Sequence, residues 1–422
     1  MGVLRIGRLT LACGALLGVI LAGTTSRAAE ARTTIYLVTM GSGDDLYQRA
    51  GHAALEVERI DALGKKTSMV YNYGDADWDD SAFVWKFFRG TLKFKLSVAG
   101  NLEQVLAVYG RGQDRDVWRQ RLALTTAQAR QVAEGLAREA KPDRCWYPYH
   151  HIKRICTTRI RDLLDGLFQG VLRRQLQTPH PMTVRDYQPR GFRGHHLAFL
   201  GGDLFTGRLH DRPITDYYVL YLPDRLRESL QRVKVPDPTG KVGPVPLAGT
   251  PERLYTRWKP PAVTAEAGMT TTVVFGTFLV IFVILSVIAW WRGPTHPRWA
   301  GLALLLHALV FGIGGLLIAT LMAVSTVPEF RQNELILIFW PTDLLLVGVA
   351  IRWLRGLAVS GVWLRRYAWA HGVVAGAWLV GQIAGVLYQR PLIISLAGAV
   401  ALVGLIVSSR RFARGTTQTS TM

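Results

Sequence analysis

The sequence has little cysteine, with three residues in a chain of 422. So few cysteines exclude the kind of disulfide scaffold that small secreted proteins use in place of a large core. The chain also has no H-E-x-x-H motif, no cysteine and histidine set at zinc spacing, and no G-x-S-x-G motif. The motifs of the common zinc proteases and serine hydrolases are therefore missing.

Two adjacent histidine pairs and one acidic cluster are the remaining candidates for metal ligands. The pairs are His150-His151 and His195-His196, and neither has partners at the spacing of a zinc site. The acidic cluster after Gly74 lacks the central glycine and the terminal glutamate of a calcium loop. We therefore expect solvated loops there, with no metal and no cofactor.

Long apolar runs, in contrast, fill the second half of the chain. They lie near 268–291, 299–324, 335–352, 367–388 and 391–409, and each approaches the length of a membrane-spanning helix. We predict an all-α transmembrane domain of five helices over 266–410 and a cytoplasmic tail over 411–422. His307, Asp343 and His371 lie within these runs, where an ionisable group either lines a cavity or forms an interhelical hydrogen bond.

Residues 1–29 have the pattern of a secretory signal peptide. A basic start over 1–8 precedes an apolar run over 9–22, and small residues near 26–28 supply a cleavage site. Cys13 lies inside the apolar run, so we interpret it as part of the signal peptide. The residues that follow are then predicted to be exported.

The distribution of arginine predicts the same orientation. Arginines are concentrated in the loops near 292–298, 352–366 and 410–414, whereas 325–334 and the turn at Arg390 contain few. Because positively charged loops stay in the cytoplasm, we predict a cytoplasmic C-terminus and a periplasmic N-terminal domain at a bacterial inner membrane. The formal net charge of +20 suits a protein that lies against anionic lipid. An exported domain meets little nucleic acid, so we expect no such partner.

Residues 30–235 mix charged, aromatic and turn residues, as a folded domain outside a membrane does. Short alternating runs predict strands over 33–40, 51–59, 69–73, 90–98 and 217–222, and a helix is predicted over 126–140. Residues 236–265 are rich in proline, glycine and valine, so we interpret them as a linker. The pattern predicts an α+β domain that is tethered to the first span.

The run over 147–168 contains the candidate nucleophile, Cys156. Apolar residues follow it at helical spacing: Ile160, Leu163, Leu164, Leu167 and Phe168. Cys156 is therefore predicted at the start of a buried helix, whose positive end and free N–H groups lower the pKa of a thiol. The alternatives are a buried structural cysteine, and a disulfide between Cys145 and Cys156 that would remove the nucleophile.

A nucleophilic cysteine needs a base, and His52 in the predicted strand over 51–59 is the candidate. Cysteine hydrolases and acyltransferases divide these roles between a helix start and a sheet, and a third group usually orients the imidazole. Asn72 is our candidate for that group, because the strand after the histidine strand can bring it alongside. Glu56 and Tyr73 are its rivals.

Several motifs, in a fixed order, also resemble a known family. They are Y-L-V-T-M-G-S-G-D-D-L-Y-Q-R-A-G-H-A-A-L, V-Y-N-Y-G-D-A-D-W, F-F-R-G-T-L-K-F-K-L-S-V and C-T-T-R-I-R-D-L-L-D. Over roughly 33–230 the chain resembles the Lnb N-terminal periplasmic domain family, named after a bacterial lipoprotein N-acyltransferase. The resemblance implies a rearranged, NlpC-type papain-like fold, and the family's histidine and cysteine match His52 and Cys156.

One departure from the family pattern lies directly before the nucleophile. Arg154 and Ile155 stand where the family usually has Asp-Asn, and His150 stands where aspartate is common. A side chain at such a position can line an oxyanion hole. The departure leaves open a changed substrate, an oxyanion hole built from backbone alone, or a weakened enzyme.

The leading hypothesis is acyl transfer at the outer face of the membrane. Cys156 would take an acyl group from a phospholipid as a thioester and pass it to the N-terminal amine of a lipoprotein. The partners would then be membrane phospholipid and a lipoprotein substrate. Two alternatives remain open: a cysteine amidase or peptidase acting on cell-wall peptide, and a catalytically inactive membrane adaptor.

Overall fold

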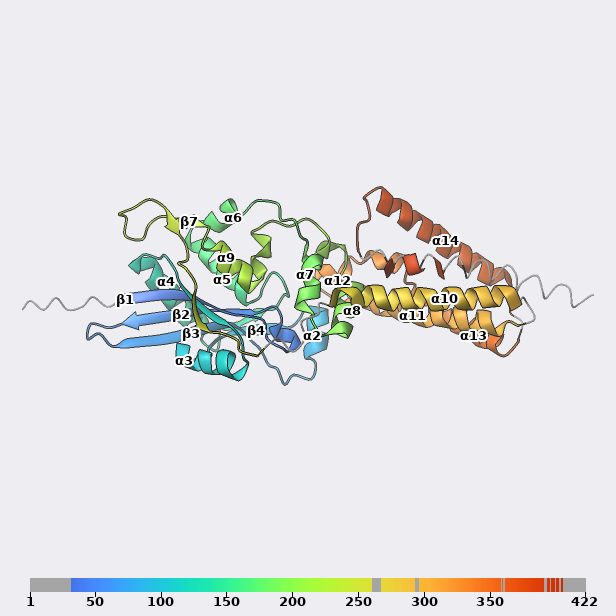
Figure 1. The fold of residues 1–422 in the computed structure, drawn as a ribbon, viewed down its shortest axis with the longest axis horizontal. Helices are drawn as coiled ribbons and strands as arrows, with labels where there is room; N and C mark the ends of the chain where they lie inside the picture. Colours follow the sequence, from blue (N-terminus) through green and yellow to red (C-terminus); the bar gives the residue numbers. More distant parts are fainter. Residues whose placement is uncertain are drawn as a thin grey trace, which may run out of the picture.

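The protein is elongated, with a sheet-containing domain at one end and a bundle of helices at the other (Figure 1). The computed structural model describes residues 32–259, 267–292, 296–357, 359, 361–390, 393, 394, 396–398, 400, 401 and 404. We call residues 32–259 the N-terminal domain, and the described residues from 267 onward the helical half. The predicted signal peptide and cytoplasmic tail lie outside the described residues, as does most of the predicted fifth span.

A seven-stranded antiparallel sheet, in the order β6-β4-β3-β2-β1-β5-β9, organises the N-terminal domain. Its strands are β1 (Arg32–Met40), β2 (His52–Ile60), β3 (Lys66–Asp75), β4 (Lys93–Val98), β5 (Val117–Arg121), β6 (Trp146–Pro148) and β9 (Glu252–Tyr255). The first four predicted strands are confirmed as β1 to β4, with a longer β3 and a shorter β4. The prediction of an α+β domain is thereby confirmed.

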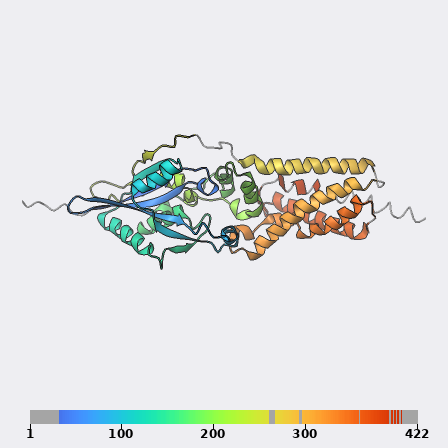
Figure 2. The same cartoon turned by 90° about the horizontal axis from the view of Figure 1, so that it is seen from below.

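Helices cover both faces of this sheet (Figures 1 and 2). The helices of the N-terminal domain are α2 (Phe83–Arg89), α3 (Leu102–Val105), the π-helix η2 (Leu106–Gly112), α4 (Thr126–Glu139), α5 (Cys156–Leu167), α6 (Val171–Gln175), α7 (Val184–Gly191), α8 (His196–Phe205) and α9 (Pro223–Ser229), with the short 3₁₀ turns η1 (Leu46–Gln48) and η3 (Arg208–His210). Among them, α7 and α8 lie between the sheet and the helical half (Figure 1). On one face, Leu55 and Val57 of β2 pack against α4 and α5. On the other face, Val38 and Val70 pack against α3 and η2. Because side chains alternate along a strand, His52 and Asn72 belong to the α3 face.

Two predictions for the end of the domain are wrong. The strand predicted over 217–222 is a 3₁₀ helix, η4 (Tyr218–Tyr221), which packs its buried aromatic and aliphatic side chains without joining the sheet. The segment predicted as a linker over 236–265 is partly folded, since β7 (Lys234–Val235) pairs with β8 (Val245–Pro246) and β9 pairs with β5. Proline and glycine enrichment did not reveal these short strands, and the partner of β9 is far away in sequence.

The helical half contains α10 (Thr270–Arg292), α11 (Arg298–Val324), α12 (Pro328–Arg331), α13 (Leu346–Leu354) and α14 (Gly361–Ile383), with the 3₁₀ turns η5 (Ala267–Met269), η6 (Glu334–Leu337) and η7 (Pro341–Leu345). Two of its helices are long and apolar enough to cross a membrane, Ala267–Arg292 and Arg298–Val324. The bent pair Pro328–Leu337 and Pro341–Leu354 is a third candidate. The described residues therefore support two or three spans, and the prediction of five is not confirmed.

The third predicted span is broken instead of continuous. Its two parts are bent by 53° relative to one another, and the break precedes Pro341. Proline has no N–H to donate and its ring clashes with the preceding helical turn, which explains a break at this point. The fourth predicted span corresponds to α14, in which Arg365, Arg366 and His371 reduce the hydropathy.

The ionisable residues of the spans contact one another. The carboxylate of Asp343 in η7 lies 3.2 Å from His307 Nε2 of α11 and 2.9 Å from His371 Nε2 of α14. The hydroxyl of Tyr367 donates to the same carboxylate at 2.8 Å. All three ionisable side chains are at most 1 % exposed. These contacts bring together residues of α11, η7 and α14.

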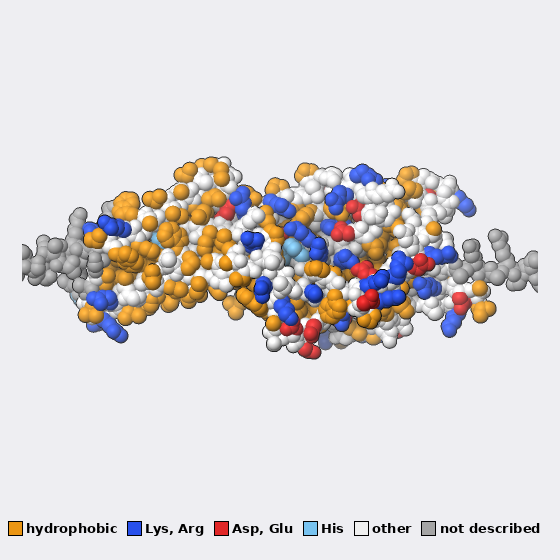
Figure 3. Space-filling model, turned by 180° about the vertical axis from the view of Figure 1, so that it is seen from behind, with side chains coloured by type: hydrophobic (Ala, Val, Ile, Leu, Met, Phe, Trp, Pro, Cys, Tyr) orange, Lys and Arg blue, Asp and Glu red, His pale blue; other side chains and the backbone are white. Residues whose placement is uncertain are grey.

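The surface of the molecule shows the same division. Hydrophobic side chains cover most of the helical half, whereas charged side chains gather on the N-terminal domain (Figure 3). Exposed apolar residues run along α10 and α11, among them Val280, Ile284, Leu309 and Leu316. An apolar surface of this extent is stable in lipid and unstable in water, in agreement with a membrane domain.

Candidate active site

The helix α5 begins at Cys156, as its apolar spacing predicted. Ile155 before it has extended backbone, and Thr158 Oγ1 accepts the N–H of Ile155 at 2.9 Å, which closes the first turn. Ile160 and Leu164 are fully buried against the sheet, so the helix cannot rotate about its axis. Thr157 Oγ1 also donates to the carbonyl of Tyr221 at 2.6 Å. The position of the Cys156 sulfur is therefore fixed from both sides of the turn.

The sheet opens where this helix meets it. The pairing of β2 with β3 runs from Ile60 to Leu55, and the first residues of β2 lie beyond it. The backbone N–H of Ala53 instead bonds the sulfur of Cys156. Cys156 therefore lies at the end of the β2–β3 pair. Its neighbour there is His52, the first residue of β2.

Gly74 in β3 makes room for the imidazole of His52. Its φ of +156° lies in a region that residues with a side chain rarely adopt, and a β-carbon there would lie 2.8 Å from His52 Cε1. A register shift between Tyr73 and Asp75 displaces the strand at the same point. Both features follow from a glycine in a strand, which tolerates a bulge and a close approach.

His52 is oriented by Asn72. The distance between His52 Nε2 and Asn72 Oδ1 is 2.5 Å. Because an amide oxygen only accepts, Nε2 carries the proton and donates it, and Nδ1 keeps a lone pair for the thiol proton of Cys156. The structure thus brings together the three residues singled out in the sequence: the sulfur contacts the imidazole, and the imidazole contacts the amide.

The pKa of the Cys156 thiol lies below its usual value. Burial by itself raises this pKa, but the charge of His52, a hydrogen bond from its ring, and the N–H groups of Ala53 and Thr157 lower it by more. Each of these groups favours the charged form of the sulfur, which is the nucleophilic form. The geometry therefore brings together a thiol of lowered pKa, an imidazole that contacts it, and an amide that bonds the imidazole.

Tyr109 completes the site and was not found from the sequence. Its ring stacks on that of His52, with 5.7 Å between centroids and 15° between planes. Its hydroxyl accepts a hydrogen bond from Asn72 Nδ2 at 3.3 Å. Tyr109 belongs to η2, and π-helical turns often occur at functional sites. No pattern in the sequence marks such a turn, so the contacts of Tyr109 with His52 and Asn72 could be found only from the fold.

The rivals of Asn72 lie away from the imidazole. Glu56 is four residues further along β2, about 13 Å by the rise of a strand, and pairs with Arg119 Nε at 2.7 Å. Tyr73 points to the opposite face of the sheet, where its hydroxyl donates to Glu139 at 2.6 Å. Among the three candidates, Asn72 is the one whose side chain bonds His52.

Cys145 is not bonded to Cys156. Both described cysteines are free, and Cys145 is buried, with its sulfur 3.7 Å from the carbonyl oxygen of Pro142. Its sulfur is held by the turn after α4 and faces that turn instead of α5. The thiol of Cys156 is therefore free in this structure.

The histidine pairs of the sequence have other contacts. His150 Nε2 lies 3.2 Å from Glu329 Oε2, and His151 Nε2 lies 3.2 Å from His210 Nε2. His196 Nδ1 lies 2.6 Å from Thr270 Oγ1 at the start of α10. Over the described residues, no cluster of three or more His, Cys, Asp or Glu side chains could hold a metal ion. His150 and His196 thus connect the N-terminal domain to the helical half.

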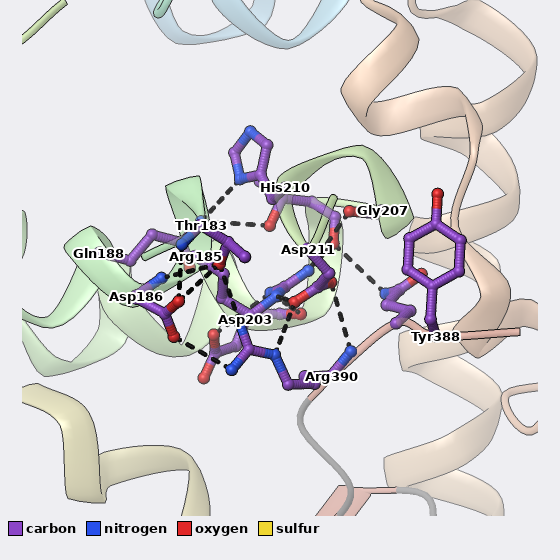
Figure 4. A network of polar contacts seen from close by, with 12 residues as sticks. Thr183, Arg185, Asp186, Gln188, Asp203, Gly207, His210, Asp211, Tyr388 and Arg390 are labelled. Atoms are coloured by element: carbon purple, nitrogen blue, oxygen red, sulfur yellow. Dashed lines mark hydrogen bonds and ion pairs between the residues drawn. The ribbon is translucent and has the colours of Figure 1, made fainter. Parts of the chain in front are cut away.

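A second polar network connects the two halves at the turn of Arg390 (Figure 4). Arg390 lies 3.1 Å from Asp211 Oδ1 and 3.0 Å from Asp186 Oδ1. The buried Arg185 shares the Asp211 carboxylate at 2.8 Å. The arginine-poor loops of the helical half, around Glu329 and Arg390, thus both lie against the N-terminal domain.

Fold and site together define a membrane protein whose α+β domain carries a Cys–His–Asn arrangement beside its helical bundle. Residues 24–190 match the family model of the Lnb N-terminal periplasmic domain, and residues 264–406 match that of the Lnb transmembrane domain. The chain belongs to the Lnb family, and it is a membrane protein with a periplasmic domain. No curated protein and no solved structure matches it.

Proposed function

We propose that this protein is a membrane-anchored periplasmic cysteine acyltransferase of the Lnb type. It moves an acyl group from a phospholipid, through a thioester on Cys156, to the N-terminal amine of a lipoprotein. One observation carries the proposal: the Cys156 sulfur contacts His52, whose other ring nitrogen is held by Asn72. A cysteine at a helix start and a histidine on a sheet are the parts of a papain-like site.

The first half-reaction transfers the acyl group to sulfur. His52 Nδ1 takes the thiol proton, and the sulfur attacks the ester carbonyl of the lipid. The ester C–O bond breaks, the proton on His52 goes to the leaving oxygen, and a lysophospholipid departs. In the second half-reaction the lipoprotein amine attacks the thioester, the C–N bond forms, the C–S bond breaks, and the amine proton returns the thiol to its resting state. Such a sequence predicts ping-pong kinetics.

The oxyanion of each tetrahedral intermediate needs hydrogen-bond donors. The first turn of α5 supplies free N–H groups, and those of Thr157 and Ala53 already point at the sulfur. Arg154 and Ile155 precede the nucleophile, and Ile155 has no polar atom to offer. The proposal therefore uses an oxyanion hole built from backbone alone.

The position of the site favours a lipid substrate. The turn over 150–154, just before Cys156, contacts Glu329 at the start of the bent candidate membrane segment that begins at Pro328. The neighbouring helix α2 exposes Val84 and Trp85, and its last carbonyl, that of Arg89, accepts the N–H of Thr326 at 3.0 Å. A site at this level is close to the acyl esters of the adjacent leaflet, and the anchor raises their effective concentration.

The test is the intact mass of the full-length protein after incubation with phospholipid that carries labelled acyl chains. We expect one acyl mass added at Cys156, released by hydroxylamine as a thioester and by a peptide with a free N-terminal amine. Cleavage of muropeptides without acyl adduct would instead identify the amidase alternative. If neither an adduct nor cleavage is found, the remaining hypothesis is a catalytically inactive membrane adaptor.

Asn72→Ala is expected to lower kcat for acyl transfer about tenfold to a hundredfold, because one hydrogen bond to a charged partner is worth about 1.5–3 kcal/mol. KM for lipid should change little, since Asn72 acts through the imidazole. Initial rates of labelled peptide formation measure both. The control is Asn101→Ala, which removes the cap of α3 on the same face and leaves His52 untouched. Equal losses in both variants would assign Asn72 a purely structural role.

A further inference from the structure

A carboxylate of the helical half reaches the turn that carries the nucleophile. Glu329 of α12 is 1 % exposed, and its two oxygens have different partners in the N-terminal domain. Oε2 lies 3.2 Å from His150 Nε2, and Oε1 lies 2.9 Å from Lys153 Nζ. Both partners belong to the turn over 150–154, which ends two residues before Cys156. A buried charge with two partners of this kind is costly to leave unpaired, so the contact is specific.

His150 organises this turn from inside. Its Nδ1 accepts the N–H of Ile152 at 3.3 Å and that of Lys153 at 3.2 Å. Since Nδ1 accepts, the neutral ring carries its proton on Nε2 and donates it to Glu329. His150 and Arg154 also form an antiparallel bridge across the turn. The carboxylate therefore selects the ring form that holds the turn closed.

The helix that carries Glu329 is itself fixed on the domain. The N–H of Gly207 donates to the Glu329 carbonyl at 2.6 Å. The ring of Phe330 stacks on that of His151, with 5.6 Å between centroids, and also contacts Phe87 and Phe88. Burial lowers the pKa of His151 to about 3, so His151 stays neutral beside the pair. The backbone hydrogen bond and the aromatic contacts of Phe330 thus hold Glu329 in one place against the domain.

We propose that Glu329 is a positioning residue, through which the membrane domain holds the turn before Cys156 and so aligns the N–H groups of the first turn of α5 for the reaction. The inference rests on the proposed function, and it adds that the periplasmic site is complete only when the helical half is docked on it.

The test compares Glu329→Gln with Glu334→Gln in the full-length protein. Glu334 is also a buried carboxylate of this interface, but it pairs with Arg208 at 3.2 Å and accepts the N–H of Gln389, away from the turn. We expect E329Q to lower kcat for acyl transfer about tenfold to a hundredfold, with KM for lipid within about twofold, as for loss of a charged hydrogen bond. E334Q should leave kcat within about twofold.

The pH profile of Cys156 alkylation separates positioning from simple electrostatics. Removing a negative charge near the thiol would by itself stabilise the thiolate and move the midpoint down. Loosening the turn weakens the N–H of Thr157 on the sulfur and moves the midpoint up, which is the result we expect. A downward or absent shift with unchanged kcat overturns the proposal, and so does an equal loss in E334Q.

A second variant, at His150, tests whether the losses in E329Q come from the His150–Glu329 contact and not from misfolding. His150→Asn keeps an acceptor near the position of Nδ1 but loses the contact with Glu329. If the pair acts as one unit, H150N and E329Q together lower kcat no more than either alone, whereas additive losses overturn the proposal. Should the wild type form no acyl adduct, the proposed function fails, and the alkylation profiles of the same variants still decide the role of Glu329.

Discussion

Replacing Cys156 by serine is expected to abolish the acyl adduct and to lower lipoprotein N-acylation by at least about 1000-fold, as loss of a nucleophile does in related mechanisms. Serine keeps the size of the side chain and its place at the start of α5. Its hydroxyl, however, does not ionise near neutral pH, so the lowered pKa that Cys156 gains from His52, Ala53 and Thr157 is lost. The readout is the N-terminal acylation state of a lipoprotein in a strain that depends on this gene.

The control for this experiment is Cys145→Ala. Cys145 is buried behind α4 and contacts the carbonyl of Pro142, so its loss should leave acylation within about twofold. Lipoprotein N-acylation that survives in C156S would contradict the assignment of the nucleophile. An adduct that disappears in C145A but persists in C156S would move the chemistry to the other cysteine.

Replacing His52 by alanine is expected to lower kcat by about 10²–10⁴, the usual contribution of a general base. It should also raise the midpoint pH of Cys156 alkylation. The sign follows from the groups around the sulfur: burial raises the thiol pKa, and the charge and hydrogen bond of His52 are the largest contributions that lower it. With these removed, less thiolate is present at a given pH.

The alkylation profile of the folded, reduced protein measures this shift directly. His196→Ala is the matched control, because His196 is exposed and bonds Thr270 at the start of α10. Its profile should coincide with that of the wild type. A wild-type midpoint at the ordinary value of a free thiol, or one that H52A leaves in place, would show that the imidazole does not act on the sulfur.

Much of the fold was determined by patterns that are local in the chain. Alternation over 51–59 and 69–73 defined β2 and β3, and the apolar stripe after Cys156 defined α5 and its first residue. Chain order and alternation then placed His52 and Asn72 on one face of neighbouring strands. The apolar runs identified the two long membrane helices in the same way, since length and hydropathy are properties of the segment itself.

Only the tertiary structure decided the contacts between distant segments. Asn72 and Tyr109 are separated by 37 positions, and His150 and Glu329 by 179, so no periodicity relates them. The edge strand β9 depends in the same way on β5, a neighbour from another part of the chain. Local propensity selects the elements, whereas packing and the pairing of buried charges select which of them meet. The sequence therefore determined which residues could form the site, and the fold decided that His52, Asn72 and Cys156 lie together beside the membrane domain.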